Sequence, residues 1–202
     1  MNFLENYQQI IAKAIEKHTF KNKPAELYEP MNYIIGNAGK RLRPMMGLMA
    51  CDLFNGNTEK AIKPALAIEY FHNFTLIHDD IMDEAPLRRN NPTIHTLHGI
   101  NVGILSGDAL LIKAYQFFED LEPELFKKCI QIFSETGAVL CEGQQMDVNF
   151  ETMEDVTYDN YIEMITNKTG VLSAASFKIG ALIADAKEEE AEHLYNFGKH
   201  IG

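Results

Sequence analysis

An acidic triplet stands out in this sequence. Asp79, Asp80 and Asp83 follow a strongly apolar stretch. In a helix Asp79 and Asp83 lie one turn apart and share a face, where close carboxylates repel one another and the C-terminal dipole disfavours them. Mg²⁺ would remove this conflict, because it takes one or two carboxylates, waters and the phosphate oxygens of a substrate. The three acids together therefore predict a site for a divalent cation such as Mg²⁺ at this helix end, and the alternative is a solvated acidic helix end.

A basic pair follows the triplet. Arg88 and Arg89 lie in residues 84–99, a segment whose prolines and asparagines exclude a regular helix. Arginine side chains bind phosphate oxygens through two parallel hydrogen bonds. The acids and arginines together are typical of a site for a metal-complexed diphosphate. The alternative is a loop whose arginines only neutralise the neighbouring carboxylates.

A second basic segment spans residues 39–44, with the sequence Gly-Lys-Arg-Leu-Arg-Pro. If Pro44 is the first residue of a helix, the free amides of Met45 and Met46 point towards any bound anion. The basic side chains add positive charge in an otherwise acidic protein. The segment indicates a second anion site, although a basic loop at a helix start is also a common structural feature.

Two weaker signals lie further along the chain. Lys168 and Thr169 form a polar break between two apolar helical stretches, and a lysine beside a hydroxyl suits phosphate contact. A plain helix junction is the alternative. Gln144 and Asp147 lie three apart on one helix face, which either lines a polar cavity or is exposed.

Helical periodicity dominates the elements that must position these residues. No segment shows the period-two alternation of a strand, so we predict a single all-α domain over residues 1–202. One helix is expected to end near Leu121 and a long one to begin at Pro123. The other predicted helices span residues 3–20, 26–35, 45–54, 59–83, 158–166, 170–185 and 188–201.

The composition narrows the possible function classes. The 202 residues are 46% hydrophobic and carry a formal net charge of −11, so the chain is a globular protein and a poor candidate for nucleic-acid binding. The three cysteines form no C-x-x-C pair, which argues against a disulfide framework or a thiolate metal site. The longest apolar stretch, 170–184, is too short to span a membrane and contains Lys178. We expect a soluble cytoplasmic protein.

Taken in order, these motifs resemble those of the trans-prenyltransferases, the polyprenyl diphosphate synthase family. The similarity extends from about residue 36 to the end of the chain. It implies an antiparallel helical bundle of the isoprenoid synthase type around a central cavity, usually in a homodimer. It also implies Mg²⁺-dependent condensation of an allylic diphosphate with isopentenyl diphosphate, giving a C15–C20 product and diphosphate.

The resemblance also assigns roles to matching positions of this sequence. The residues implied to hold isopentenyl diphosphate are Lys40, Arg43, His72 and Arg89. Those implied to bind Mg²⁺ are Asp79 and Asp83, with Asp80 in support. Those implied to hold the allylic diphosphate are Arg88, Lys168 and Thr169. The residues expected to be catalytic are Asp79, Asp80, Asp83 and Lys168.

Product length is expected to depend on residues before the acidic triplet. Phe74 precedes Asp79 by five residues, roughly 7.5 Å along a helix, and its ring either floors the hydrocarbon tunnel or is ordinary core packing. In the family, an aromatic residue here is similar to the farnesyl and geranylgeranyl diphosphate synthases. Thr75, in place of a second aromatic residue, favours the C20 product.

One departure from the family leaves alternatives open. The family has a second aspartate-rich motif on a later helix, and this sequence ends at Gly202 where the approach to that motif is expected. We therefore expect a truncated chain or a shortened family member. The alternatives are a non-catalytic partner subunit of a prenyl synthase and a histidine–aspartate metal phosphohydrolase built around His78 and Asp79.

Overall fold

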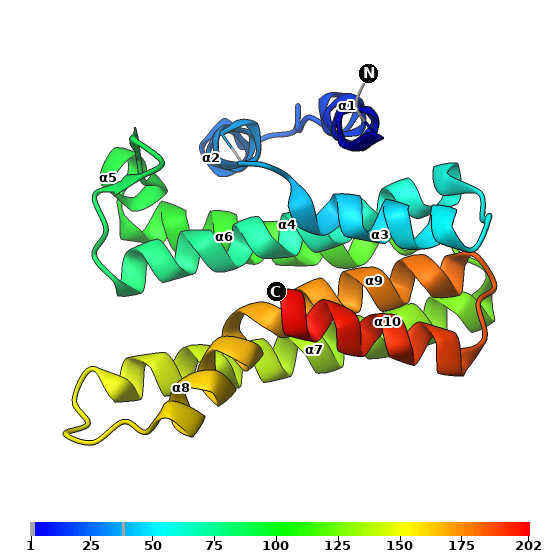
Figure 1. Cartoon of the computed structure of the whole chain (residues 1–202). Coiled ribbons are helices and arrows are strands. Elements are labelled where there is room, and N and C mark those ends of the chain that lie inside the picture. Colours follow the sequence, from blue (N-terminus) through cyan, green and yellow to red (C-terminus); the bar gives the residue numbers. More distant parts are fainter. Residues whose placement is uncertain (1–2, 38) are drawn as a thin grey trace. The chain divides into compact units, whose positions relative to one another are not determined.

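The computed structural model describes residues 3–37 and 39–202, and most of them are helical (Figure 1). The predicted all-α class is confirmed. The chain divides into two compact units, each made of two segments. The first unit comprises Met1–Met45 and Leu66–Glu119, and the second comprises Met46–Ala65 and Asp120–Gly202. Whether these units act as the single domain that the sequence predicts stays a prediction.

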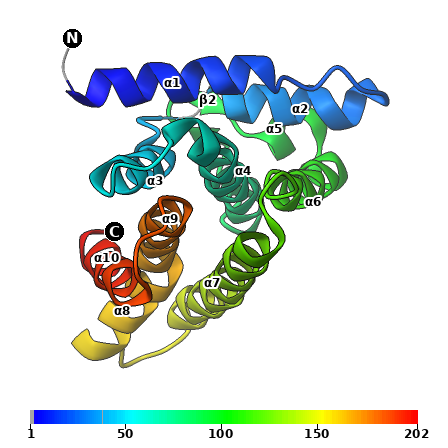
Figure 2. The same cartoon turned by 90° about the vertical axis from the view of Figure 1, so that its right-hand side faces the viewer.

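The elements of the first unit carry most of the candidate site residues. Two of its helices, α3 (Leu42–Leu53) and α4 (Thr58–Met82), continue into the second unit. Its other helices are α1 (Phe3–Lys17), α2 (Ala25–Gly36), α5 (Ile94–His98) and α6 (Ile100–Gln116). Helices α1 and α2 run across α4 and α6, as Figures 1 and 2 show from two sides.

A short β-hairpin corrects the expectation of a strand-free chain. Its strands are β1 (Leu87–Arg88) and β2 (Asn91–Pro92), which pair antiparallel. The turn residues Arg89 and Asn90 have φ values of 52° and 63°, as a tight two-residue hairpin turn requires. Strands of two residues are too short to produce an alternating pattern, so sequence periodicity cannot reveal them.

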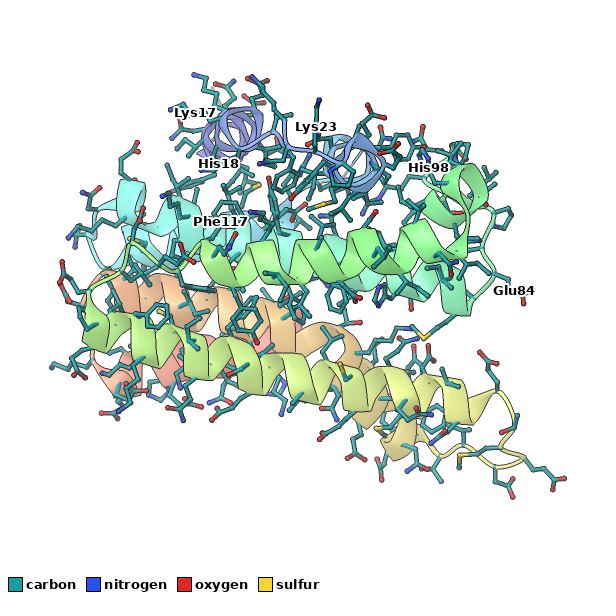
Figure 3. The ribbon with its side chains drawn as sticks, turned by 180° about the vertical axis from the view of Figure 1, so that it is seen from behind. Lys17, His18, Lys23, Glu84, His98 and Phe117 are labelled. Atoms are coloured by element: carbon teal, nitrogen blue, oxygen red, sulfur yellow. The ribbon has the colours of Figure 1, made fainter. Side chains whose placement is uncertain are left out.

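An aromatic cluster ties the connection between α1 and α2 to α4 and α6. The Tyr70 ring centroid lies 4.8 Å from that of Phe117 and 5.8 Å from that of Phe20. The His18 ring contacts Phe117 edge to face at 5.2 Å, and both residues are labelled in Figure 3. Burial raises the pKa of Tyr70 to about 12, so its hydroxyl keeps the proton that it donates to the His18 carbonyl. The cluster anchors the helix that carries the acidic triplet.

The second unit packs around a buried helix, α9. Helix α9 spans Val171–Ile183, and the elements around it are α7 (Pro123–Phe150), α8 (Tyr158–Ile165), a π-helical turn η1 (Thr166–Gly170) and α10 (Glu188–Ile201). Helices α9 and α10 lie side by side in both views (Figures 1 and 2). Where α9 crosses α3, a Cβ added at Gly180 would lie 2.1 Å from the carbonyl oxygen of Gly47. The close backbone approach explains the glycine at this crossing.

Candidate active site

The end of α4 positions the acidic triplet. The Asp83 amide donates to the Asp79 carbonyl at 2.9 Å, so the helical turn continues through the motif. Glu84 then takes a left-handed conformation, with φ 50°, and the Ala85 amide donates to the Asp80 carbonyl at 3.0 Å. This is a C-cap arrangement that ends the helix and reverses the chain. The reversal brings the hairpin back towards the triplet.

Arg88 on the hairpin binds two of the three acids. Its Nε lies 2.7 Å from Asp80 Oδ1 and its Nη2 lies 3.3 Å from Asp79 Oδ2. The Asp80 side chain is only 3% exposed, whereas that of Asp79 is 19% exposed. Burial raises the pKa of Asp80, and the Arg88 guanidinium opposes this shift. Asp80 therefore anchors Arg88, while the Asp79 side chain remains partly exposed.

The donor set at this helix end is compatible with Mg²⁺, and the binding of the ion by Asp79 and Asp83 stays a prediction. Within residues 3–37 and 39–202, no group of three or more His, Cys, Asp or Glu side chains could hold a metal ion by itself. Asp79 and the exposed Asp83 offer two carboxylates on successive turns. Two carboxylates with positions left for water and phosphate suit Mg²⁺, whereas a structural zinc site needs four ligands from the protein.

The basic segment 39–44 enters its helix earlier than expected. Helix α3 begins at Leu42, and the Met45 amide donates to the Arg41 carbonyl at 3.3 Å. The expectation that Pro44 starts the helix and leaves the Met45 amide free for an anion is therefore wrong. The physical reason is the left-handed conformation of Arg41, φ 56°, which turns the chain into the helix two residues sooner.

Three cationic or potentially cationic side chains converge beside this segment, and we call Arg43, His72 and Arg89 the basic cluster. Arg43 Nη1 lies 3.3 Å from His72 Nε2. The Arg89 guanidinium packs on Gly39, where an added Cβ would lie 2.9 Å from its central carbon. Burial and then Arg43, Arg89 and Arg88 lower the pKa of His72 to about 3. The cluster gathers charges of one sign around a neutral imidazole, which an incoming anion would relieve.

The lowered pKa of His72 should be visible in the acid stability of the chain. Between about pH 6.5 and pH 3 the unfolded state takes up a proton that the folded state does not. The free energy of unfolding should therefore decrease as the pH falls through this window, by up to about 1.4 kcal/mol per pH unit. Urea denaturation of His72→Gln from pH 7 to pH 4 should give a shallower slope than the unaltered chain.

The matched control for this prediction is His98→Gln, at an exposed position labelled in Figure 3. We expect this variant to keep the steeper slope of the unaltered chain. Equal slopes for the His72 and His98 variants would contradict a His72 imidazole that stays neutral in the folded chain.

The residues expected to set product length lie on the turns before the triplet. The Phe74 ring packs edge to face against Phe71 at 5.4 Å and against His78 at 4.9 Å. Thr75 Oγ1 donates to the His72 carbonyl at 2.8 Å. Phe74 is half-buried, which is compatible with core packing and with a tunnel wall alike. Its role in product length stays a prediction.

Lys168 and Thr169 lie in the second unit, on the π-helical turn η1. Lys168 Nζ lies 2.5 Å from Asp147 Oδ2 on α7, so Asp147 pairs with the lysine. A Cβ at Gly143 would lie 2.3 Å from the Lys168 backbone nitrogen, which explains the glycine one turn before Asp147. π-Helical turns are frequent at functional sites. The approach of Lys168 and Thr169 to the acidic triplet stays a prediction.

Glu69 is a polar residue near the basic cluster that the sequence motifs did not identify. Glu69, on α4, has a side chain that is 3% exposed and bonded to Arg41 at 3.2 Å. The sequence could have indicated this role, because Glu69 is the only charged residue in the apolar run 64–71. A carboxylate in a buried run needs a hydrogen-bonding or charged partner.

The fold and site together define an all-α protein with adjoining acidic and basic groups suited to a metal-complexed diphosphate. The family model for polyprenyl synthetase matches residues 24–202, and the chain belongs to this family. It is 40% identical over 201 residues to a geranylgeranyl diphosphate synthase of Methanosarcina mazei, covering 98% of this chain and 62% of the relative. It is 37% identical over 209 residues to one of Sulfolobus acidocaldarius, covering 100% of this chain and 63% of the relative.

Solved structures agree with this assignment. A geranylgeranyl pyrophosphate synthase superposes with a TM-score of 0.97 at 43% identity, covering 100% of this chain and 62% of the other. The geranylgeranyl pyrophosphate synthetase of Geoglobus acetivorans gives 0.96 at 36% identity, covering 100% and 66%. The chain thus spans somewhat less than two thirds of the length of the first curated relatives that it matches.

Two further expectations can be compared with these findings. The family assignment leaves the phosphohydrolase alternative without support, and His78 instead contacts the Ile104 carbonyl at 3.2 Å and Asp108 at 3.7 Å. Within the described part of the chain, no helix combines the length and apolarity needed to cross a bilayer.

Proposed function

We propose that this protein takes part in the Mg²⁺-dependent condensation of an allylic prenyl diphosphate with isopentenyl diphosphate. The product is a short-chain prenyl diphosphate of C15–C20, released with inorganic diphosphate. The observation that carries the proposal is the contact of Arg88 with Asp79 and Asp80, next to the basic cluster, in which the charges of Arg43, Arg89 and Arg88 all lower the pKa of His72. A metal-bound diphosphate needs carboxylates for the metal ion and cationic side chains for the phosphate oxygens, and this site offers both.

The acidic triplet and Arg88 serve the allylic substrate. Mg²⁺ held by Asp79 and Asp83 would supply Lewis-acid stabilisation of the charge that develops on the departing diphosphate. Arg88 would turn from the carboxylates towards the phosphate oxygens, and Asp80 would keep its guanidinium in reach. The bond between the allylic C1 and the diphosphate oxygen breaks, and its electron pair leaves with the diphosphate.

The basic cluster, with Lys40, holds the second substrate. Arg43 and Arg89 would bind the diphosphate of isopentenyl diphosphate, and neutral His72 would donate a hydrogen bond without adding charge. The double bond of this substrate then attacks the allylic carbocation. The released diphosphate takes the proton lost in the final step, so no side-chain base is needed. Apolar helix walls exclude the water that would trap the carbocation.

Lys168 and Thr169 of the second unit would complete the binding of the allylic diphosphate. Lys168 is paired with Asp147 at 2.5 Å, so a phosphate would compete with this carboxylate for the ammonium group. The positive charge of Lys168 would then be paired with a negative group both before and after the substrate binds.

The product is proposed to be of C15–C20 length, and the relatives favour the C20 end of this range. The relatives of Methanosarcina mazei and Sulfolobus acidocaldarius are named as geranylgeranyl diphosphate synthases. Thr75, which occupies the position after Phe74, favours the same length. A cytoplasmic location is part of the same proposal.

The test is a condensation assay. The purified protein is incubated with a C15 allylic diphosphate, isopentenyl diphosphate and Mg²⁺, and the products are separated by chromatography. We expect a C20 diphosphate and released diphosphate with Mg²⁺, and neither with a chelator. Binding of both substrates without condensation would favour the non-catalytic partner subunit instead.

We also propose that the protein forms a homodimer through α5 and α6. These helices expose five large apolar side chains, each more than two fifths accessible: Leu97, Ile100, Ile104, Leu105 and Ile112. An apolar face of this kind is typical of an interface between subunits.

Sedimentation velocity tests the dimer. The double variant Leu105→Glu/Ile112→Glu places two charges on the proposed interface and should shift the protein from dimer to monomer. The control Tyr158→Glu/Tyr161→Glu changes two exposed aromatic residues on α8 and should leave the dimer intact. A monomeric unaltered protein, or a dimeric Leu105/Ile112 variant, would contradict the proposal.

A further inference from the structure

A buried carboxylate lies beside the basic segment 39–44. Glu69 on α4 has a side chain that is 3% exposed, and its Oε1 lies 3.2 Å from Arg41 Nη1. The Asn73 side-chain amide donates to the same oxygen at 3.2 Å and to the Glu69 carbonyl at 2.8 Å. Glu69 is thus held by two partners, one on its own helix and one on the basic segment.

Arg41 is the unusual residue of this pair. Its backbone φ of 56° is a left-handed conformation that side chains disfavour, and its guanidinium is turned inward with 15% of the side chain exposed. The second guanidinium nitrogen donates to the Ile35 carbonyl near the end of α2 at 2.5 Å. A buried guanidinium cannot lose its proton and needs a counter-charge, which Glu69 supplies.

The backbone conformation of Arg41 determines the positions of the Lys40 and Arg43 side chains on either side of it. Lys40 precedes it and remains exposed, while Arg43 follows it and reaches His72, one turn after Glu69 on the same face of α4. Glu69 also acts on Arg43 electrostatically: it raises the pKa of that guanidinium, which burial and Arg89 lower. The carboxylate therefore offsets part of the repulsion within the basic cluster.

We propose that Glu69 is a positioning residue of this anion site. Through Arg41 it fixes the start of α3, so that Lys40 and Arg43 present their charges to one diphosphate. Glu69 does not touch the substrate itself. The inference rests on the proposed function, because it assumes that the diphosphate belongs to isopentenyl diphosphate.

A double-mutant cycle tests the inference. Isothermal titration calorimetry measures the affinity for isopentenyl diphosphate of the unaltered protein, Glu69→Gln, Arg41→Met and the double variant. We expect each single variant to bind about tenfold more weakly, as the loss of a charged contact predicts. The double variant should be little weaker than either single one, because both changes release the same backbone. The control Glu59→Gln removes an exposed carboxylate from the first turn of α4 and should bind normally.

A readout specific to positioning comes from the two substrates. In the condensation assay Glu69→Gln should raise the KM for isopentenyl diphosphate about tenfold and leave the KM for the allylic diphosphate within twofold. A purely structural role would affect both alike. If Glu69→Gln does not fold, Arg41→Lys keeps the charge, cannot reach both Glu69 and Ile35, and should show the same split.

The outcomes separate the inference from the proposed function. Normal affinity of Glu69→Gln, additive effects in the cycle, or equal changes in both KM values would overturn the role of Glu69 and leave the function standing. Absence of isopentenyl diphosphate binding by the unaltered protein would overturn both.

Discussion

Replacing Asp79 with Asn should lower the rate of diphosphate release by about 10²- to 10³-fold, the cost of removing one group that stabilises developing charge. Asn keeps the shape of the side chain and loses the negative charge that a Mg²⁺ ligand needs. The Mg²⁺ concentration that gives half of the maximal rate should rise as well. A continuous assay of released diphosphate at varied Mg²⁺ measures both effects.

The same substitution should leave stability nearly unchanged, which separates this role from a structural one. Asp79 lies next to the buried Asp80 at the C-terminal end of a helix, so removing its charge relieves repulsion. Arg88 keeps its 2.7 Å contact with Asp80. We expect the free energy of unfolding to change by less than about 1 kcal/mol, as is common when a residue retained for function is replaced.

The matched control for Asp79→Asn is Glu59→Gln, an exposed carboxylate at the other end of α4. It should change neither the rate nor the Mg²⁺ requirement. An Asp79→Asn protein that releases diphosphate within twofold of the unaltered rate would refute the assignment of the metal site.

Replacing Arg43 with Met should weaken the binding of isopentenyl diphosphate by about 10- to 150-fold, because a hydrogen bond between charged groups contributes about 1.5–3 kcal/mol. Arg43→Lys keeps the charge but loses the planar guanidinium that matches phosphate oxygens. Its affinity should therefore lie between those of the unaltered protein and Arg43→Met. Calorimetric titration of each variant measures the affinity. The allylic diphosphate should bind as before.

Arg43 also offers a comparison between binding and stability. Burial lowers the pKa of its guanidinium, Glu69 opposes this shift and Arg89 adds to it, so the charged form gains little from its surroundings. Arg43→Met should therefore not reduce the free energy of unfolding, although it weakens substrate binding. Lys60→Met, at an exposed lysine of α4, is the control and should bind normally. Equal affinities of the Arg43 and Lys60 variants would exclude Arg43 from the anion site.

Much of the candidate site could be predicted from the sequence because it is local. The spacing of Asp79 and Asp83 reports their common face directly, since one helix carries both residues. The proximity of Arg88 to the acids follows from a short connection. The family model and the relatives confirm the family on which the remaining roles depend.

The β1–β2 hairpin and the start of α3 could not be predicted from the sequence. Strands of two residues carry no periodic pattern, and the left-handed conformations of Arg41 and Arg89 have no signature in residues that usually avoid them. These conformations are maintained by contacts from elsewhere in the fold, such as that of Arg41 with Glu69.

By itself, the sequence determined the helical class, the acidic and basic motifs and the family, because each depends on residue types at short, regular separations. Only the tertiary structure decided the partners of the charged groups. Arg41 and Glu69 are 28 residues apart, and Lys168 and Asp147 are 21 apart, so folding alone brings them together. Burial has the same origin: it lowers the pKa of His72 and holds Asp80 away from water because of what packs around them.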